Sequence, residues 1–380
     1  MRGTRVRAWW VLAVAAAVLG GCAARPDEAI NRRHEAQRKA MVRSGQVVGR
    51  NAAGFDETLV FTSFRGRGDS GLHLATSRDG YTWEEVSEGP VWTPEIGGVK
   101  GMRDPSVARG PDGVYHMVWT LMAPMPRSIG YARSTDLLNW TDARAIQVVP
   151  DDWDVKWTWA PELFYDQSSG EWIIAWSTAV AGRHAETEGQ AEENHRIYCN
   201  TTRDFKEVSP ARPYLDPGYP VIDPSWLALD GEVLLFFKDE RHWGKEGKKK
   251  QIRYVRGPGP HGPWSEPSDA ITMRWCEGPS PIVLDGEVVV YFDEYTRDSY
   301  GAVRSRDLKQ WDDISALMSF PRGHRHGSVI RVPEEDLRRL EERRERERQK
   351  RFEQETRAGA GCAGAGRRHV HVRRRPGCAS

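Results

Sequence analysis

Cysteine, net charge and long apolar runs are all scarce in this sequence. Its 380 residues carry a net charge of +1, which argues against a nucleic acid held by a broad basic field. After the N-terminal segment no stretch is apolar and long enough to cross a bilayer. The four later cysteines match no zinc spacing and suggest no disulfide framework: Cys199, Cys276, Cys362 and Cys378. We interpret Cys276 as a packing residue.

The N-terminus has the pattern of a targeting segment. Arg2, Arg5 and Arg7 precede a short apolar core from Ala8 to Val18, too short for a typical spanning helix. The core ends in Leu19-Gly20-Gly21-Cys22, which resembles a bacterial lipoprotein signal. Residues 1–22 are therefore predicted to be a lipoprotein signal segment, with Cys22 lipidated as the mature N-terminus and the exported protein anchored to a membrane at the cell surface or in the periplasm. An ordinary signal peptide cleaved near Ala23-Ala24 is the alternative.

Three similar motifs each carry a carboxylate at the start of a strand-like run. They are Arg103-Asp104-Pro105, Ile222-Asp223-Pro224 and Glu277-Gly278-Pro279. Each acid is followed seven or eight residues later by an Asp-Gly pair and then an aromatic, β-branched run. Asp-Gly between two such runs predicts a hairpin turn. A single Asp-Pro is more often a local turn, but three matched acids in similar hairpins could converge on one centre.

A second repeat alternates with the first and marks where units end. Its copies begin at Ser77, Ser134, Thr202 and Ser305, and most of them run Ser-x-Asp and close on a Trp. The Gly-Pro segment from Gly257 to Trp264 fills the remaining interval. No helical period appears between residues 55 and 332. Five such points with several short strands each predict an all-β fold, a five-bladed β-propeller.

The ends of this repeating region indicate how the ring closes. The first unit has no acidic inner strand before Leu59, while a spare strand runs from Gly327 to Val332. We expect the C-terminal strand to complete the first blade, because closure removes exposed sheet edges. The predicted organisation is therefore a signal peptide (1–22), a tether (23–54), the propeller (55–333), a charged solvated helix (334–357) and a disordered tail (358–380).

Five short motifs in this order resemble those of glycoside hydrolase family 43, a five-bladed propeller family of inverting glycosidases. The similarity covers roughly residues 58–340. It depends on these segments: Arg103-Asp104-Pro105, Trp159-Ala160-Pro161-Glu162, Ile222-Asp223-Pro224-Ser225, Glu277-Gly278-Pro279 and Arg325-His326-Gly327. The resemblance implies hydrolysis of terminal arabinofuranosyl, xylosyl or galactosyl-type units of glycans, with a polysaccharide or oligosaccharide as the partner, a monomer as the working form and no required cofactor.

The resemblance also assigns roles to the three acids. Asp104 matches the general base that activates water, and Glu277 matches the general acid that protonates the leaving oxygen. Asp223 matches the residue that orients Glu277 and raises its pKa, which agrees with the effect of a nearby like charge. In an inverting enzyme the two working carboxyls stand roughly 6.5–9.5 Å apart.

Four further residues are candidates for binding. We expect Trp159 to stack against the sugar and Glu162, usually Asp in the family, to contact a hydroxyl or to stabilise the centre. Lys238 lies at a strand end near the predicted pocket rim. His326, on the closing strand, is either a satisfied buried histidine or, as the resemblance implies, a residue that holds a water or a calcium ion on the propeller axis.

Three other functions compete with this interpretation. A retaining fructan hydrolase of the related clan would need an early Asn-Asp-Pro-Asn motif, which is absent, although Cys276-Glu277 fits it. A sialidase would need six blades and an arginine cluster. A catalytically silent carbohydrate-binding propeller would be favoured by loss of any one acid, yet all three are present.

Overall fold

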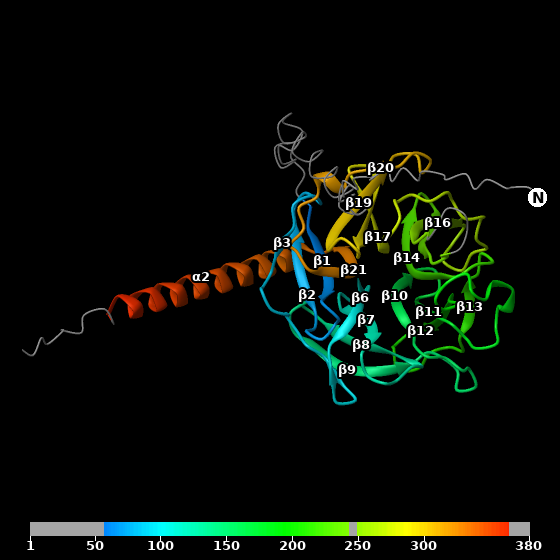
Figure 1. The fold of residues 1–380 in the computed structure, drawn as a ribbon, viewed down its shortest axis with the longest axis horizontal. Coiled ribbons are helices and arrows are strands. Elements are labelled where there is room, and N and C mark those ends of the chain that lie inside the picture. The colour runs from blue at the N-terminus through cyan, green and yellow to red at the C-terminus, as the bar shows by residue number, and fades with distance from the viewer. Residues whose placement is uncertain (1–56, 243–248, 365–380) are drawn as a thin grey trace, which may run out of the picture.

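The computed structural model describes residues 57–242 and 249–364, with side chains to residue 356. The predicted signal peptide with Cys22, the tether, and the tail beyond residue 364 lie outside this part. The regular structure of the described chain consists mainly of short antiparallel strands, with one long helix at its C-terminal end (Figure 1). Within the described residues, no helix is long and apolar enough to cross a membrane.

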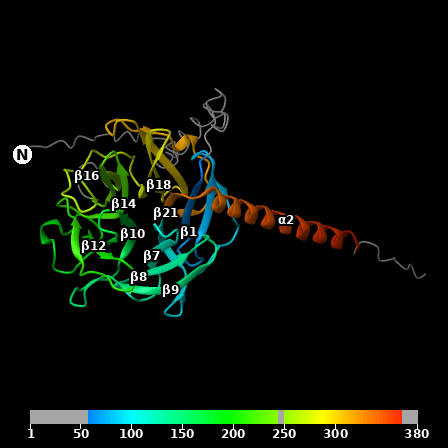
Figure 2. The same cartoon turned by 180° about the vertical axis from the view of Figure 1, so that it is seen from behind.

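Five small sheets surround one axis, as the repeats predicted, and make a five-bladed β-propeller (Figures 1 and 2). From the axis outward, the first blade consists of β21(His324–Arg331), β1(Leu59–Arg65), β2(His73–Ser77) and β3(Glu84–Glu85). The second consists of β6(Met102–Arg109), β7(Tyr115–Leu121), β8(Ser128–Ser134) and β9(Trp140–Gln147). The third is β10(Trp159–Asp166), β11(Glu171–Thr178), β12(Arg196–Thr202), β13(Arg212–Leu215).

The fourth blade has three strands and the fifth has four. The fourth consists of β14(Val221–Leu229), β15(Glu232–Asp239) and β16(Gln251–Gly257). The fifth consists of β17(Glu277–Leu284), β18(Glu287–Glu294), β19(Ser299–Ser305) and β20(Asp312–Asp313). The remaining elements are a small hairpin, β4(Glu95–Ile96) and β5(Val99–Lys100), and two 3₁₀ turns, η2(Ala185–Thr187) and η3(Ser315–Leu317). The inner strands β6, β10, β14, β17 and β21 contact one another in a closed ring.

The Asp-Gly pairs form the inner hairpins as predicted. Asp230 and Gly231 connect β14 to β15 with φ angles of 49° and 82°, and Asp285 and Gly286 connect β17 to β18 with 51° and 72°. Positive φ at both central residues is the geometry that matches the twist of a two-residue hairpin. In the first acidic hairpin only Gly113 takes this conformation, because the loop between β6 and β7 is longer.

The Ser-x-Asp repeats are structural turns at the outer edges of the blades. In the second blade the Ser134 hydroxyl accepts a backbone hydrogen bond from Leu137 (2.9 Å), and Asp136 accepts one from Asn139 (2.7 Å). The copies that begin at Ser77, Thr202 and Ser305 use the same pairing. Side chains that bond to local backbone amides stabilise tight turns. The repeat therefore encodes blade ends and not a sialidase site.

The ring closes through the C-terminal strand, which confirms the prediction. Strand β21 pairs with β1 along its length, with Leu59 opposite Arg331 and Phe61 opposite Val329. At Gly327 the backbones come close, because an added Cβ atom would lie 1.7 Å from the carbonyl oxygen of Thr62. Only glycine fits this contact.

Gly327→Ala is expected to destabilise the protein by about 1–3 kcal/mol or more, because the added methyl group must push the closing strands apart. The measurement is denaturant unfolding followed by tryptophan fluorescence. Gly89→Ala is the matched control, since a Cβ atom there meets nothing within 4 Å. Equal midpoints for the two variants would refute the importance of this contact.

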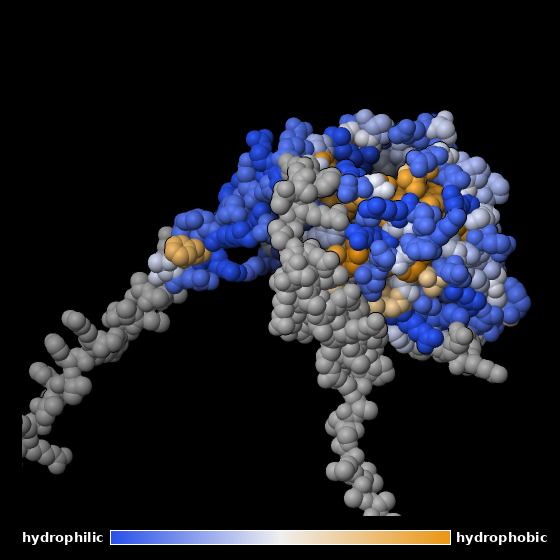
Figure 3. All heavy atoms as spheres, turned by 90° about the horizontal axis from the view of Figure 1, so that it is seen from above, coloured by the Kyte–Doolittle hydropathy of each residue, from blue (hydrophilic) through white to orange (hydrophobic). Residues whose placement is uncertain are grey.

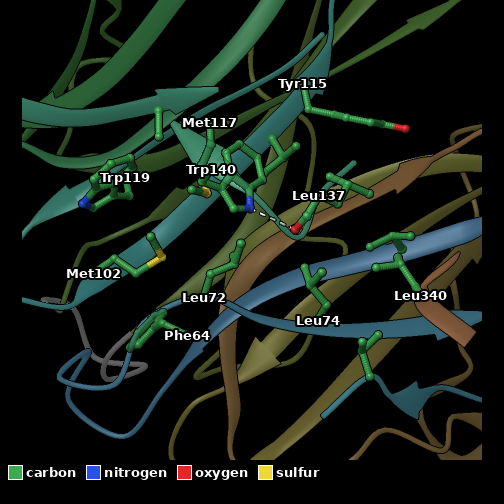
Figure 4. Close-up of a cluster of buried hydrophobic side chains, with 14 of the residues drawn as sticks. Phe64, Leu72, Leu74, Met102, Tyr115, Met117, Trp119, Leu137, Trp140 and Leu340 are labelled. Atoms are coloured by element: carbon green, nitrogen blue, oxygen red, sulfur yellow. Dashed lines mark hydrogen bonds between the residues drawn. The ribbon is translucent and has the colours of Figure 1, made fainter. Parts of the chain in front are cut away.

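Helix α2(Glu334–Gly364) is attached to the first blade along its N-terminal half, where Arg344 pairs with Glu84 and Arg351 with Glu88, and then extends away from the propeller as a largely hydrophilic arm (Figures 1 and 3). Leu337 and Leu340 are buried in the core between the first two blades, and Figure 4 shows Leu340 among the residues of this core. The Tyr115 hydroxyl donates to Asp336 (2.7 Å), and Arg78 pairs with Glu334 (2.8 Å). The helix continues to Gly364, past the predicted boundary at residue 357.

Candidate active site

Each of four inner strands carries a bulge directly before a proline. Asp104, Ala160, Asp223 and Gly278 occupy this position, with φ angles of 51°, 43°, 58° and 59°. A left-handed backbone at a residue other than glycine costs of order 1 kcal/mol or more and is often found at functional sites. The bulges lift these residues out of the sheet ladder near the N-terminal ends of the four inner strands.

The third acid is displaced by one residue from the other two, which corrects the expectation of equivalent positions. Glu277 precedes the bulge residue Gly278 and pairs with Asp293 on the neighbouring strand. The reason is steric: a Cβ atom at Gly278 would lie 2.4 Å from the His326 ring. No side chain fits there, so the carboxylate comes from the preceding position.

The three acids line one pocket of about 270 Å³, together with three of the four other predicted binding residues. Those three are Trp159, Lys238 and His326. Further lining residues were not singled out as site residues from the sequence: Arg103, Glu192, Glu193, His195, Ile222, Glu240, Lys250, Trp275 and Tyr295. Several of them come from loops between strands, where no repeat or motif indicates a position.

Asp104 is held in a defined orientation by Thr120, which lies on β7 of the same blade. The Thr120 hydroxyl donates to the Oδ2 atom of Asp104 (2.8 Å) and accepts a hydrogen bond from the backbone amide of Ala160 (2.8 Å). Because the amide can only donate, the direction of both hydrogen bonds is fixed. The His326 Nδ1 lies 3.5 Å from the other carboxylate oxygen of Asp104 and 4.0 Å from Asp223. Burial disfavours a charged His326, but the carboxylates of Asp223 and Asp104 outweigh it and raise the histidine pKa.

Glu277 is bound by two cations. Lys238 donates to its Oε2 (2.8 Å) and Arg325 to its Oε1 (3.1 Å). Burial acts to raise the pKa of Glu277, but the charge and hydrogen bond of Lys238, with help from His326 and Arg325, lower it to about 2. The sequence led us to expect that Asp223 raises the pKa of Glu277; the cations in contact with Glu277 act in the opposite direction and lower its pKa overall.

Asp223 bonds to the backbone directly beside Glu277. Its Oδ2 accepts the amide hydrogen of Gly278 (3.0 Å), which ties the fourth blade to the fifth beside the acid. Burial raises the pKa of Asp223, although the charges of His326 and Lys238 oppose the shift. Of the two neighbouring carboxyls, Asp223 therefore retains a proton more readily than Glu277.

The cations at the pocket belong to an alternating network. Lys238 also pairs with Glu240 (2.7 Å), which in turn contacts Lys250. Arg325 donates to Asp293 (2.6 Å), whose side chain is fully buried. The acidic side chains on the far side of Lys238 and Arg325 hold both cations in place, so that they are preorganised hydrogen-bond donors for Glu277.

Glu162 lies outside the pocket, contrary to its predicted role in substrate binding. It occupies the same place after its bulge as Ser106, Ser225 and Ser280 do after theirs, and these serines bond from blade to blade. Ser225 donates to the Glu162 carboxylate (2.9 Å). Burial raises the pKa of Glu162 to about 7, despite the hydrogen bonds from Ser106 and Ser225. The structure favours the other predicted role, stabilisation of the centre.

Trp159 lies against other rings in addition to lining the pocket. Its ring is nearly parallel to that of His195 (centroids 4.9 Å apart, 20°) and to that of Trp157 (6.0 Å, 14°). Burial lowers the pKa of His195 to about 4, so this imidazole is neutral near pH 7. Trp275 and Tyr295, which pack edge to face, supply further aromatic surface.

No group of three or more histidine, cysteine or acidic side chains that could hold a metal ion occurs in the part of the chain that the structure describes. A calcium ion at His326 stays a prediction, and we derive no chemical step from a metal. Cys199 and Cys276 are buried free thiols, in agreement with a packing role.

Residues 57–338 match a family described as "Probable glycosyl hydrolase domain", related to glycoside hydrolase family 43. The chain belongs to this family. The match spans all five blades, and it confirms the resemblance read from the five motifs and the enzyme class, a glycoside hydrolase. No curated protein matches the sequence.

Solved structures of similar fold are distant in sequence. An α-L-arabinofuranosidase from Lactobacillus brevis is 17% identical, with 56% of this chain and 72% of that chain covered and a TM-score of 0.45. A thermostable family-43 glycoside hydrolase is 15% identical (62% and 81% covered, TM-score 0.46). An α-L-arabinofuranosidase from Podospora anserina in complex with cellotriose is also 15% identical (62% and 73%, TM-score 0.44).

Proposed function

We propose that this glycoside hydrolase removes a terminal sugar from a glycan by single displacement with inversion at the anomeric carbon. The observation that supports the proposal is the convergence of Asp104, Asp223 and Glu277 from three blades on one pocket. Two carboxyls on opposite sides of a glycosidic bond are the minimal equipment for this reaction. The third carboxyl, Asp223, supports the acid through the Gly278 amide.

In this mechanism Asp104 takes a proton from a water molecule, whose oxygen attacks the anomeric carbon. The bond from that carbon to the glycosidic oxygen breaks, and Glu277 delivers a proton to the departing oxygen. Asp104 suits the base because Thr120 fixes one of its oxygens and leaves the other near His326. His326 and Lys238 place positive charge beside the acids and act as positioning residues.

The pocket favours one sugar residue over a long internal segment of chain. A volume of about 270 Å³ is small for an oligosaccharide, and Trp159, Trp275 and Tyr295 provide aromatic surfaces for the C–H faces of a ring. We propose an arabinofuranosyl, xylosyl or galactosyl-type terminal unit. The protein is expected to act as a monomer.

The test is an assay of protein that lacks residues 1–22 with the nitrophenyl α-L-arabinofuranoside, β-D-xyloside, β-D-galactofuranoside and β-D-galactoside. Turnover of one of them identifies the sugar, and proton NMR of the first-formed anomer identifies the mechanism. Inverted configuration supports the proposal; retained configuration would support a fructan-type double displacement instead.

One observation favours a second candidate, a carbohydrate-binding propeller without catalysis. The two cations on Glu277 hold it as an anion, a state that accepts sugar hydroxyl groups but donates no proton. Saturable glycan binding with no product released over the whole pH range of stability would decide for this candidate.

We also propose that the protein is an exported lipoprotein, on the basis of the basic start, short apolar core and Leu19-Gly20-Gly21-Cys22 ending. Cys22→Ser is expected to abolish incorporation of radiolabelled palmitate and to move the protein from the membrane to the soluble fraction. Cys199→Ser is the control for loss of a cysteine. Unchanged labelling in Cys22→Ser would overturn the assignment.

A further inference from the structure

Exposed apolar side chains are concentrated at one place beside the pocket. In the described part of the chain, the large hydrophobic residues that remain exposed are Met122, Met125, Trp157 and Phe352. Phe352 lies on the projecting helix α2. The other three line a single groove, and Trp157 is the most open of them at 47% exposure. Clustered exposed apolar surface usually marks a binding site.

The groove has a volume of about 650 Å³ and adjoins the catalytic pocket. Its walls are the loop between β7 and β8, which contributes Met122, Pro124, Met125 and Pro126, and the segment before β10, which contributes Trp157. Arg103 and Trp159 line both the groove and the pocket. A ligand that starts in the pocket can therefore continue into the groove.

The groove is preformed. The Thr178 hydroxyl donates to the Trp157 carbonyl (2.5 Å), and the Thr158 hydroxyl donates to the Pro126 carbonyl (2.8 Å), which ties the two walls together. The Trp157 ring lies nearly parallel to that of Trp159. Little conformational entropy is then lost when a ligand packs on these side chains.

The chemistry of the lining points to a carbohydrate chain. Trp157 and the methionines offer apolar surface to sugar C–H faces, while the charged side chains of the groove, Arg103 and Lys156, are both donors to hydroxyl or carboxylate oxygens. No carboxylate lines the groove. This composition suits neutral sugars or uronic acids.

We propose that the groove binds the part of the glycan that continues from the sugar in the catalytic pocket, so that the natural substrate is an oligosaccharide or polysaccharide and not a simple monoglycoside. The proposal depends on the proposed function for the position of the terminal sugar. Trp157 is the residue that contributes most to chain affinity, and it takes no part in bond cleavage.

The experiment compares Trp157→Ala with the wild type on two substrates of the same terminal sugar. One is a trisaccharide, which extends into the groove; the other is the glycosyl fluoride, whose leaving group is too small to enter it. We expect kcat/KM for the trisaccharide to fall on the order of 10-fold, mainly through KM, while the value for the fluoride stays within about 2-fold. Phe352→Ala, the matched removal of an exposed aromatic ring, should change neither value.

The outcomes separate this proposal from the proposed function. Equal values for the trisaccharide in wild type and Trp157→Ala, or equal losses on both substrates, would overturn the groove and leave the hydrolase intact. If no substrate is cleaved, arabino-, xylo- and galacto-trisaccharides are titrated calorimetrically: binding that Trp157→Ala weakens would support the groove and refute the hydrolase. Absence of both binding and cleavage would refute both.

Discussion

Asp104→Asn is expected to reduce kcat on the order of 10²–10⁴-fold, because the amide cannot take a proton from the attacking water. The substitution keeps the size of the side chain and can still accept the hydrogen bond from Thr120, so folding and sugar binding should be preserved. The measurement is steady-state kinetics on the substrate identified in the nitrophenyl panel. Asp152→Asn, the same change at an exposed position outside the pocket, is the control.

Glu277→Gln distinguishes the acid from the base. It should be nearly as harmful as Asp104→Asn for a substrate with a poor leaving group, because that oxygen must be protonated as the bond breaks. With a dinitrophenyl leaving group, which departs without a proton, Glu277→Gln should recover most of its activity and Asp104→Asn should not. The opposite pattern would exchange the two roles, and full activity in both variants would mean that other carboxylates carry the reaction.

Much of the fold could be predicted because it is encoded in local turn chemistry. Asp230-Gly231 has few alternatives to a hairpin, and Ser134 with Asp136 bonds its own backbone whatever surrounds it. Five such units in sequence leave a closed ring as the simple way to remove sheet edges. The Gly-Pro segment from Gly257 to Trp264 also predicted that a blade ends there. The structure has the fourth blade at this place, although the segment forms no fourth strand.

The candidate site was predictable only where it belongs to the repeats. Asp104 and Asp223 stand at bulges that a proline marks, but Glu193 and His195 reach the pocket from a loop whose path depends on packing across the blade. The groove was hidden for the same reason. Its Met-Ala-Pro-Met-Pro segment, residues 122–126, reads as an ordinary turn until the structure places it against Trp157.

The sign of an electrostatic effect is harder to predict than the position of a residue. Both Lys238 and Arg325 lie in motifs that the sequence analysis identified, yet a sequence does not give the distances from their side chains to Glu277. An opposite charge in direct contact outweighs a like charge further away. That balance decides which form of Glu277 is present before the substrate binds.

Removing the positive charge at Lys238 is therefore expected to change the pH dependence of catalysis. As a general acid Glu277 works only when protonated, so activity falls as pH rises through its pKa. Lys238 and Arg325 lower this pKa, which places the alkaline limb of kcat/KM at acidic pH in the wild type. In Lys238→Met the pKa of Glu277 rises, and the limb should move to higher pH by roughly 1–3 units.

Lys238→Arg is the matched control, because it keeps a cation beside Glu277 and should keep the limb near its wild-type position. Lys238 is 3% exposed and also pairs with Glu240, so the melting temperature of each variant must show that the protein is folded at the assay pH. A general loss of activity with an unchanged profile would mean that Lys238 only supports the structure. A displaced limb in Lys238→Met alone would identify the lysine as the group that sets the protonation of the acid, and it would explain how the lowered pKa of Glu277 is compatible with catalysis at low pH.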